Sequence, residues 1–344
     1  MLTTDFDYEL PPELIAQTPL EPRDASRMLV LDRASGAVTH RAFRNLGRYL
    51  VAGDVLVLNR TRVLPARLEA RKLPSGGRVE LLLVRRFGDG TWESLVRGRR
   101  VPLGTTLQVG SDGPTAAVLD ITPAGGRRLQ FDQPPELWLH RYGAMPLPPY
   151  IHRRLEDPER YQTVYSSDAG SAAAPTAGLH FTTEYLDQLR EGGVDIEYVT
   201  LHVGLDTFRP VAEDDPTTHA IHTEWCQVPS DVADRISRAK ADGRRIVAVG
   251  TTAVRTLETA AAAAKEQGTS SLLIPYSGDT SLFILPGHQF RAVDALLTNF
   301  HLPRSTLLLL VSAFAGRERI LAAYREAVEQ RYRFFSFGDC MLIL

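Results

Sequence analysis

Residues 245–265 read RIVAVGTTAVRTLETAAAAAK, and this stretch decides the fold class. Its first five residues, 245–249, form an apolar run of the kind found in strands that are buried on both faces of a sheet. Gly250 follows, and a helix is expected from about Thr252 to Lys265. A buried strand that runs through a glycine into a helix is the unit from which α/β domains with parallel strands are built.

The sequence on either side continues this alternation of strands and helices. Strands are expected at 196–203 and 307–311, and helices at 184–190, 230–241 and 317–330. Thr183 is expected to cap the first of these helices. The main domain is therefore predicted to be α/β with a mixed or parallel sheet.

Between Arg67 and Phe131 the pattern changes to short strands separated by turns. The strand-like segments are 79–84, 91–96 and 116–121, and the turns rich in glycine and proline are 74–77, 88–90, 110–114 and 123–126. Short strands at such regular spacing predict a small antiparallel β-barrel.

Composition limits the class of protein further. The chain has 344 residues, enough for two domains, and only two cysteines, Cys226 and Cys340. We expect no disulfide framework, a reducing cytoplasm, and two thiols that are ordinary buried residues. The best apolar run, 306–314, is too short to span a membrane, and residues 1–5 lack a signal-peptide pattern, so no membrane association is expected.

Positive charge is concentrated in one part of a chain whose net charge is −2. Between Arg41 and Leu103 there are 14 lysines and arginines against 5 aspartates and glutamates. Arginine binds phosphate oxygens through two parallel hydrogen bonds, so this region fits an RNA-binding face. A solvated surface of an arginine-rich protein explains the charge equally well.

A nearly uncharged stretch of small residues, 170–182, ends in a histidine just before a helix start. Small residues let a ligand approach the backbone, and a helix start directs free N–H groups toward it. The candidate site residues in this stretch are Thr176, Gly178, His180 and Phe181. An ordinary connection rich in alanine and glycine has the same composition.

Further motifs occur in a fixed order along the chain. They are LPPELIAQ at 10–17, PRDASR at 22–27, MPLPPYI at 145–151, GSAAAPTAGLHFT at 170–182, VTLHVGLDTF at 199–208, HAIHTE at 219–224, GTTAVR at 250–255, LTNFHLP at 297–303 and YRFFSFGD at 332–339. Over nearly its whole length the chain thereby resembles the S-adenosylmethionine:tRNA ribosyltransferase-isomerase family of queuosine biosynthesis, the QueA family.

The resemblance implies a reaction in which S-adenosylmethionine donates a ribosyl group. The group is transferred to 7-aminomethyl-7-deazaguanine at the tRNA wobble position and isomerised, giving epoxyqueuosine with release of adenine and methionine. S-adenosylmethionine is then a co-substrate, no metal is implied, and the partner is the anticodon arm of tRNA. The resemblance also implies a barrel at 63–145 inserted into a catalytic domain formed by 1–62 and 146–344. We expect a cytoplasmic monomer.

The implied chemistry needs a base and an acid at the carboxyl ends of the strands, where ligands of open α/β sheets bind. His180 or His202 fits the base by type. Asp206 would need burial to raise its pKa for that role, and is otherwise a turn residue. His301 is the weaker candidate for the acid that protonates the leaving adenine.

The remaining candidates are expected to bind the substrates. Thr251 and Thr252 lie at a helix start, where they either contact a ligand or simply cap the helix. Arg255 or Arg304 would hold the methionine carboxylate. The side chains expected to stack on or hydrogen-bond the wobble base are Tyr150, Phe181 and Asn299.

Two features stay outside this candidate site. The run His219, His222, Glu224 and Cys226 has metal-ligand residue types, but no second cluster accompanies it and no metal is expected. The segment 59–63 reads NRTRV, whereas the family usually carries an aspartate after the asparagine, so Arg60 is not assigned to the site.

Two competing functions are open. One is a non-catalytic RNA-binding protein built on the barrel and the arginine-rich region. The other is an S-adenosylmethionine-dependent methyltransferase of unusual fold, because the chain has no G-x-G-x-x-G after a strand.

Overall fold

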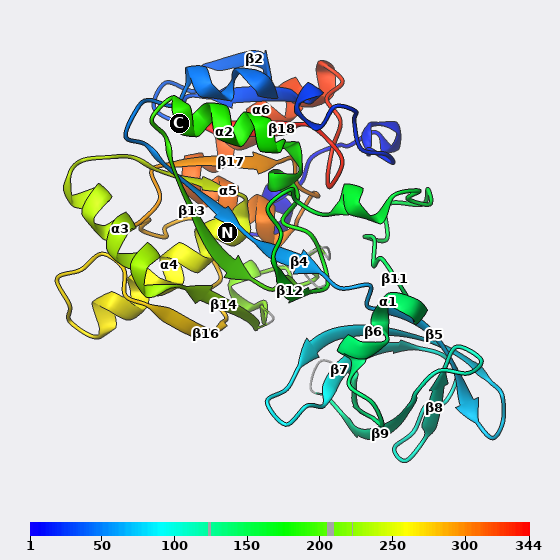
Figure 1. The fold of residues 1–344 in the computed structure, drawn as a ribbon. Helices are drawn as coiled ribbons and strands as arrows, with labels where there is room; N and C mark the ends of the chain where they lie inside the picture. Colours follow the sequence, from blue (N-terminus) through cyan, green and yellow to red (C-terminus); the bar gives the residue numbers. More distant parts are fainter. Residues whose placement is uncertain (123–124, 205–209, 222) are drawn as a thin grey trace. The chain divides into compact units, whose positions relative to one another are not determined.

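The computed structural model describes residues 1–122, 125–204, 210–221 and 223–344. The chain forms two compact units (Figure 1). The larger unit comprises Met1–Thr61, Pro148–Asp168 and Pro175–Leu344, and the smaller comprises Arg62–Leu147 and Ala169–Ala174.

The larger unit is built on a mixed sheet. Its strands are β1 (Arg27–Leu31), β2 (Val38–Ala42), β3 (Val55–Asn59), β13 (Asp195–Leu201), β14 (Glu224–Val228), β15 (Ile246–Val249), β16 (Tyr276–Thr280), β17 (Ala295–Asn299) and β18 (Cys340–Ile343). Across the described residues the strand order is β16-β14-β13-β3-β15-β17-β18-β1-β2. Neighbours β13, β3, β15 and β17 pair in parallel, while β14 and β18 pair antiparallel to β13 and β17. The predicted α/β fold with a mixed sheet is confirmed.

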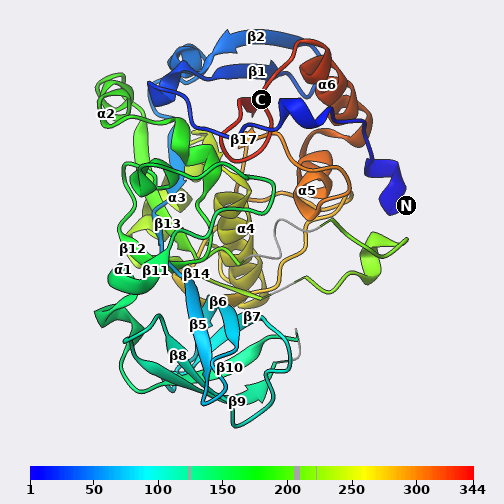
Figure 2. The same cartoon turned by 90° about the vertical axis from the view of Figure 1, so that its right-hand side faces the viewer.

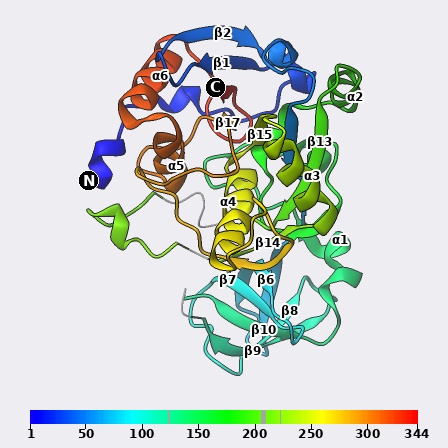
Figure 3. The same cartoon turned by 90° about the vertical axis from the view of Figure 1, so that its left-hand side faces the viewer.

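Helices cover both faces of this sheet. They are α2 (Thr183–Glu191), α3 (Ser230–Ala241), α4 (Thr251–Glu266), α5 (Thr306–Ala315) and α6 (Arg317–Glu329). Successive strand side chains point to opposite faces, so Val57 packs in the core that holds α3 to α6, and Leu58 packs with α2. Figures 2 and 3 show α2 on the opposite side of the strands from α5 and α6.

The prediction of a strand at 307–311 is wrong, because these residues lie in the helix α5. The Ser305 side chain caps this helix and accepts a hydrogen bond from the Leu308 N–H at 3.2 Å. Almost every residue of α5 is buried. A helix buried on all sides is apolar all round and lacks the 3.6-residue pattern that separates a helix from a strand.

The smaller unit is a closed antiparallel barrel. Its strands are β5 (Arg67–Leu73), β6 (Arg78–Arg86), β7 (Trp92–Arg97), β8 (Thr106–Val109), β9 (Thr115–Ile121) and β10 (Arg127–Phe131). They pair in the order β5-β6-β7-β10-β9-β8, and β8 pairs back with β5. The pairings confirm the predicted barrel. The unit also holds α1 (Leu139–Tyr142) and β11 (Gly143–Ala144), which pairs with β5, while β4 (Thr61–Val63) and β12 (Asp168–Ser171) form a separate two-stranded ladder.

Both cysteines are free and buried, as expected. Of the helices in the described ranges, none combines the length and the apolar character that a bilayer span requires.

The N-terminal cap of α2 gives a first prediction. Thr182, not the expected Thr183, accepts a hydrogen bond from the Tyr185 N–H, at 3.1 Å. We expect Thr182→Ala to lower the free energy of unfolding by about 1 kcal/mol, because it leaves a helix N–H without its partner. The control Thr183→Ala changes an exposed residue in the same turn. Urea unfolding of both variants checks this, and equal midpoints would contradict the assignment of the cap.

Candidate active site

Four parallel strands bring the candidate residues to one edge of the sheet. Because β13, β3, β15 and β17 are neighbours that run the same way, their carboxyl ends lie together. The residues that follow these ends are His202 after β13, Arg60 and Thr61 after β3, Gly250 after β15, and Phe300 and His301 after β17. Ligands of open α/β sheets bind at this edge.

The start of α4 presents polar groups at this edge. Gly250 has φ +84°, a backbone conformation that favours glycine, and it lets the chain turn from β15 into the helix. Thr251 and Thr252 are the first two helical residues, and neither side chain forms a cap. The Thr252 hydroxyl is buried and has no hydrogen-bond partner among the described residues. An unpaired buried hydroxyl at a helix start is a ready donor for a ligand.

A pocket at the end of β17 collects four candidates. It is lined by Tyr150, Thr176, Asn299, Phe300, His301, Leu302, Ser305, Leu307, Phe335 and Ser336. The Tyr150 hydroxyl lies 2.7 Å from the Ser336 hydroxyl, and the Tyr150 and Phe335 rings are 4.8 Å apart between centroids. The pocket therefore combines an aromatic wall with polar side chains, which suits a planar heterocycle.

His180 is buried beside this pocket, and both ring nitrogens are bonded. Nδ1 lies 2.8 Å from the Ser26 hydroxyl and Nε2 lies 3.0 Å from Asn299 Oδ1. Asn299 Nδ2 donates to the Phe335 carbonyl, so its Oδ1 accepts and His180 Nε2 is the donor. Burial lowers the pKa of His180 to about 4. This histidine is neutral at neutral pH and has no nitrogen left for a substrate.

His301 is also buried, and it is held from several sides. Its Nε2 lies 2.8 Å from the Thr298 hydroxyl, its carbonyl accepts from Tyr8, and its N–H donates to Tyr324. Burial lowers the pKa of His301 to about 3. At neutral pH this side chain is a neutral imidazole, which donates a hydrogen bond but carries no extra proton.

His202 differs from the other two histidines. Its Nδ1 lies 2.8 Å from the Thr61 hydroxyl, and its ring stacks on Trp225 with centroids 5.1 Å apart. Nε2 makes no hydrogen bond to any described residue. Burial lowers the pKa of His202, and the negative charge of Asp168 acts against that shift. One ring nitrogen is therefore available for proton transfer.

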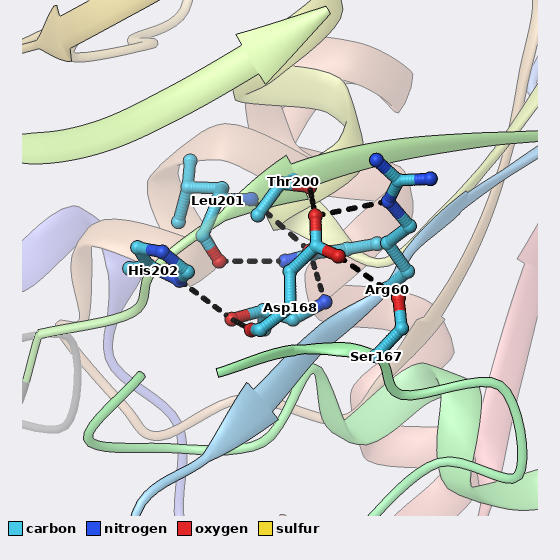
Figure 4. Close-up of polar contacts among 8 residues, drawn as sticks. Arg60, Ser167, Asp168, Thr200, Leu201 and His202 are labelled. Carbon is cyan, nitrogen blue, oxygen red and sulfur yellow. Dashed lines mark hydrogen bonds and ion pairs between the residues drawn. The ribbon is translucent and has the colours of Figure 1, made fainter. Parts of the chain in front are cut away.

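Asp168 gathers three donors next to His202 (Figure 4). Its carboxylate accepts from Arg60 Nε at 2.9 Å, from the Thr200 hydroxyl at 2.6 Å and from the Ser167 hydroxyl at 2.9 Å. Burial alone would raise the pKa of Asp168, but the two hydroxyl hydrogen bonds and the Arg60 charge outweigh it and hold the pKa below its usual value. Asp168 is not among the candidates drawn from the sequence. The only sequence feature that pointed to it is the arginine at position 60, whose positive charge needs a carboxylate partner.

Arg255 lies at the base of a second pocket. Its guanidinium pairs with Glu224 and donates to the Leu282 carbonyl at 3.1 Å. The side chain is only 7% exposed, yet Nη2 has no partner in the described part of the chain. The pocket is otherwise mostly apolar and is lined by Gly204, His219, Ile221, Glu224, Leu282, Phe283, Ile284, Thr306, Leu307 and Leu310. Arg304, by contrast, is half exposed and pairs with Asp7 at 3.2 Å.

Two candidates serve the packing of the protein itself. A Cβ on Gly178 would lie 2.0 Å from the Tyr165 hydroxyl, so the glycine makes room for that ring. Phe181 is fully buried against Phe43, with ring centroids 4.9 Å apart. Asp206 and His222 lie outside the described residues.

Two described members of the metal-type run have protein partners. His219 bonds Glu213 at 2.8 Å, and Glu224 pairs with Arg255. Over the residues that the structure describes, no group of three or more His, Cys, Asp or Glu side chains is placed to hold a metal.

Comparisons with known proteins agree along the whole chain. A family model described as "Queuosine biosynthesis protein" matches residues 3–343. Two similar curated proteins are the S-adenosylmethionine:tRNA ribosyltransferase-isomerases of Symbiobacterium thermophilum, 56% identical, and Clostridioides difficile, 51% identical, each with full coverage of both chains. A crystal structure of S-adenosylmethionine tRNA ribosyltransferase from Thermotoga maritima is 44% identical and matches 99% of this chain and 100% of that one, with a TM-score of 0.57.

The buried histidines give a pH prediction. The folded pKa values of His180 and His301, about 4 and about 3, lie below the value near 6.5 of an unfolded chain. The unfolded state then binds more protons, so stability falls as the pH drops from about 6.5 toward 4. Each histidine contributes a slope of about 1.4 kcal/mol per pH unit in that window.

Urea unfolding between pH 4.5 and 7 measures this slope. We expect His301→Gln to have a shallower slope than the wild type, while His140→Gln, which changes an exposed ring, keeps the wild-type slope. Parallel slopes for His301→Gln and the wild type would contradict a neutral buried His301.

Proposed function

The chain belongs to the queuosine biosynthesis family of S-adenosylmethionine:tRNA ribosyltransferase-isomerases, and we propose that it carries out this reaction at the carboxyl edge of β13, β3, β15 and β17. The ribosyl group of S-adenosylmethionine passes to the aminomethyl group of the tRNA base and is isomerised, and adenine and methionine leave. The location rests on three polar atoms at this edge that have no hydrogen-bond partner among the described residues: His202 Nε2, Thr252 Oγ1 and Arg255 Nη2.

His202 is the proposed base. The sulfonium of S-adenosylmethionine acidifies the neighbouring C5′ protons, so a neutral imidazole with an available nitrogen can remove one. His202 has such a nitrogen, whereas both nitrogens of His180 are bonded. His180 instead holds Asn299 in place. Asp206 is an alternative base of the carboxylate type from the same segment.

Methionine and adenine need different partners. An unpaired buried donor costs roughly 1–3 kcal/mol, so a carboxylate that accepts from Arg255 Nη2 removes that penalty. Arg255 is therefore preferred over the half-exposed Arg304 as the partner of the methionine carboxylate. His301, a neutral donor on the β17 side, is the proposed hydrogen-bond partner of the departing adenine.

The wobble base is assigned to the pocket at the end of β17. Tyr150 and Phe335 supply aromatic surface, and Thr176 and Asn299 supply polar atoms. Phe181 is buried against Phe43 in the core, and Gly178 leaves room for the Tyr165 ring.

The barrel carries a surface suited to RNA. Arg71 and Arg78 lie directly opposite each other on β5 and β6, and Arg97, Arg99 and Arg100 follow nearby in the chain. Like charges on opposed strand positions repel, and these five arginines have no ion-pair partner among the described residues. A polyanion relieves that repulsion, so the anticodon arm of tRNA is the proposed partner of this surface.

The remaining features of the proposal follow from the family. S-adenosylmethionine acts as a co-substrate rather than a resident cofactor, without a metal, in a cytoplasmic monomer. The domain division is placed at about residues 62 and 146, with the barrel at 63–145 inserted into the catalytic domain formed by 1–62 and 146–344.

Product analysis tests the reaction. With S-adenosylmethionine and tRNA that carries the aminomethyl-deazaguanine base, we expect free adenine and a heavier nucleoside by mass spectrometry. We expect His202→Gln to lower the rate of adenine release by roughly 10²-fold or more while tRNA binding persists. Release of S-adenosylhomocysteine would instead indicate a methyltransferase, and tRNA binding without any product would indicate a binding protein.

Charge reversal tests the RNA surface. We expect Arg71→Glu with Arg78→Glu to weaken tRNA binding at least about tenfold and to reduce the slope of log K against log salt by roughly two. The matched control reverses Arg238 and Arg325, two exposed arginines on α3 and α6. Equal loss of binding in both double variants would contradict a specific role for the barrel.

A further inference from the structure

The Thr61 hydroxyl contacts both the His202 ring and the main chain of Asp168. Its oxygen is 2.8 Å from His202 Nδ1 and 3.4 Å from the Asp168 carbonyl oxygen. Thr61 is fully buried, and its N–H donates to Asn59 Oδ1 at 3.1 Å. The branched side chain in this fixed backbone has few rotamers, so the hydroxyl is held in place.

The directions of these two hydrogen bonds are linked, because Thr61 has only one hydroxyl proton. The Asp168 carbonyl only accepts, the hydroxyl has one proton, and a neutral imidazole has one N–H. If the Thr61 proton goes to the carbonyl, then Thr61 must accept from His202. The N–H of the imidazole is then at Nδ1, and Nε2 holds the lone pair.

We infer that Thr61 is a positioning residue that selects the Nδ1–H tautomer of His202 and thereby leaves Nε2 as the basic atom. The inference rests on the proposed role of His202 as the base. In the proton-transfer step the C5′–H bond of S-adenosylmethionine breaks, its electron pair stays on C5′ beside the sulfonium, and the proton binds Nε2. The resulting imidazolium keeps its Nδ1–H hydrogen bond to Thr61.

The surrounding contacts hold the Asp168 carbonyl within reach of the Thr61 hydroxyl. The carboxylate of Asp168 is anchored by Arg60, Thr200 and Ser167, on three separate positions of the chain. The main chain of this segment is also fixed, because the Ser167 and Asp168 N–H groups donate to the Arg60 carbonyl at 2.9 Å and 3.2 Å. The Asp168 end of this chain of hydrogen bonds is therefore held in place.

The tautomer can be read directly by long-range ¹H–¹⁵N NMR of the full-length protein labelled in histidine, with His202→Gln assigning the signal. We expect the wild type and Thr61→Ser to have the Nδ1–H form near neutral pH. Thr61→Val keeps the shape but removes the acceptor, so its signal should shift toward the Nε2–H form. An Nε2–H form in the wild type overturns the inference without reference to activity.

Turnover gives the second readout. We expect Thr61→Val to lower kcat at least about tenfold with little change in KM for either substrate, and Thr61→Ser to restore most of kcat. The control Thr3→Val removes another buried hydroxyl, which donates to the Glu213 carbonyl at 2.5 Å. Full activity in Thr61→Val, or a loss confined to KM, overturns the inference.

The two readouts separate this inference from the proposed function. If His202→Gln retains full activity, then His202 is not the base, and the proposed function of that residue fails whatever the tautomer. If His202→Gln is inactive and the wild-type ring has the Nε2–H form, then only the role of Thr61 fails.

Discussion

Parallel pairing of β3 with both β13 and β15 is the constraint on which the rest of the larger unit depends. Asn59 pairs with Val199 on one side, and Val57 pairs with Ala248 on the other. Because β17 continues the same direction beyond β15, four strands that are far apart in the sequence end at one edge. Every proposed catalytic or binding group of the larger unit is within a few residues of such an end, or on an element that packs against it.

At that edge most polar side chains are used to hold the protein together. Asn59 bridges β3 and β13 through the N–H and carbonyl of Leu201, and His180 joins Ser26 to Asn299. Asn59 and His180 are satisfied by these bonds and therefore have little to offer a substrate. His202, Thr252 and Arg255 differ in that each has one polar atom without a hydrogen-bond partner in the described part of the chain. The proposed proton transfer and the proposed contact to the methionine carboxylate are therefore assigned to two of these atoms, on His202 and Arg255.

The fold could be predicted wherever the signal was local. The strand and helix within residues 245–265 could be read because their periodicity and the intervening glycine are contiguous, and the barrel because its turns recur. The helix that contains residues 307–311 could not be predicted. It is buried almost completely, so its sequence is apolar throughout and lacks the helical spacing of apolar and polar residues. The site was less accessible, because whether a histidine nitrogen is already bonded depends on partners more than 100 residues away, such as Ser26 and Asn299 for His180.

Arg60 supports the hydrogen-bonded group around His202 through its contact with Asp168. Its ion pair with Asp168 is about one-third exposed, so its contribution to stability is modest, roughly 0–1 kcal/mol. Geometry matters more than energy here, because the guanidinium fixes a carboxylate whose main-chain carbonyl faces the Thr61 hydroxyl. Arg60 is thus connected to His202 by contacts through Asp168 and Thr61. Arginine at this position therefore belongs to the contacts that support the proposed base.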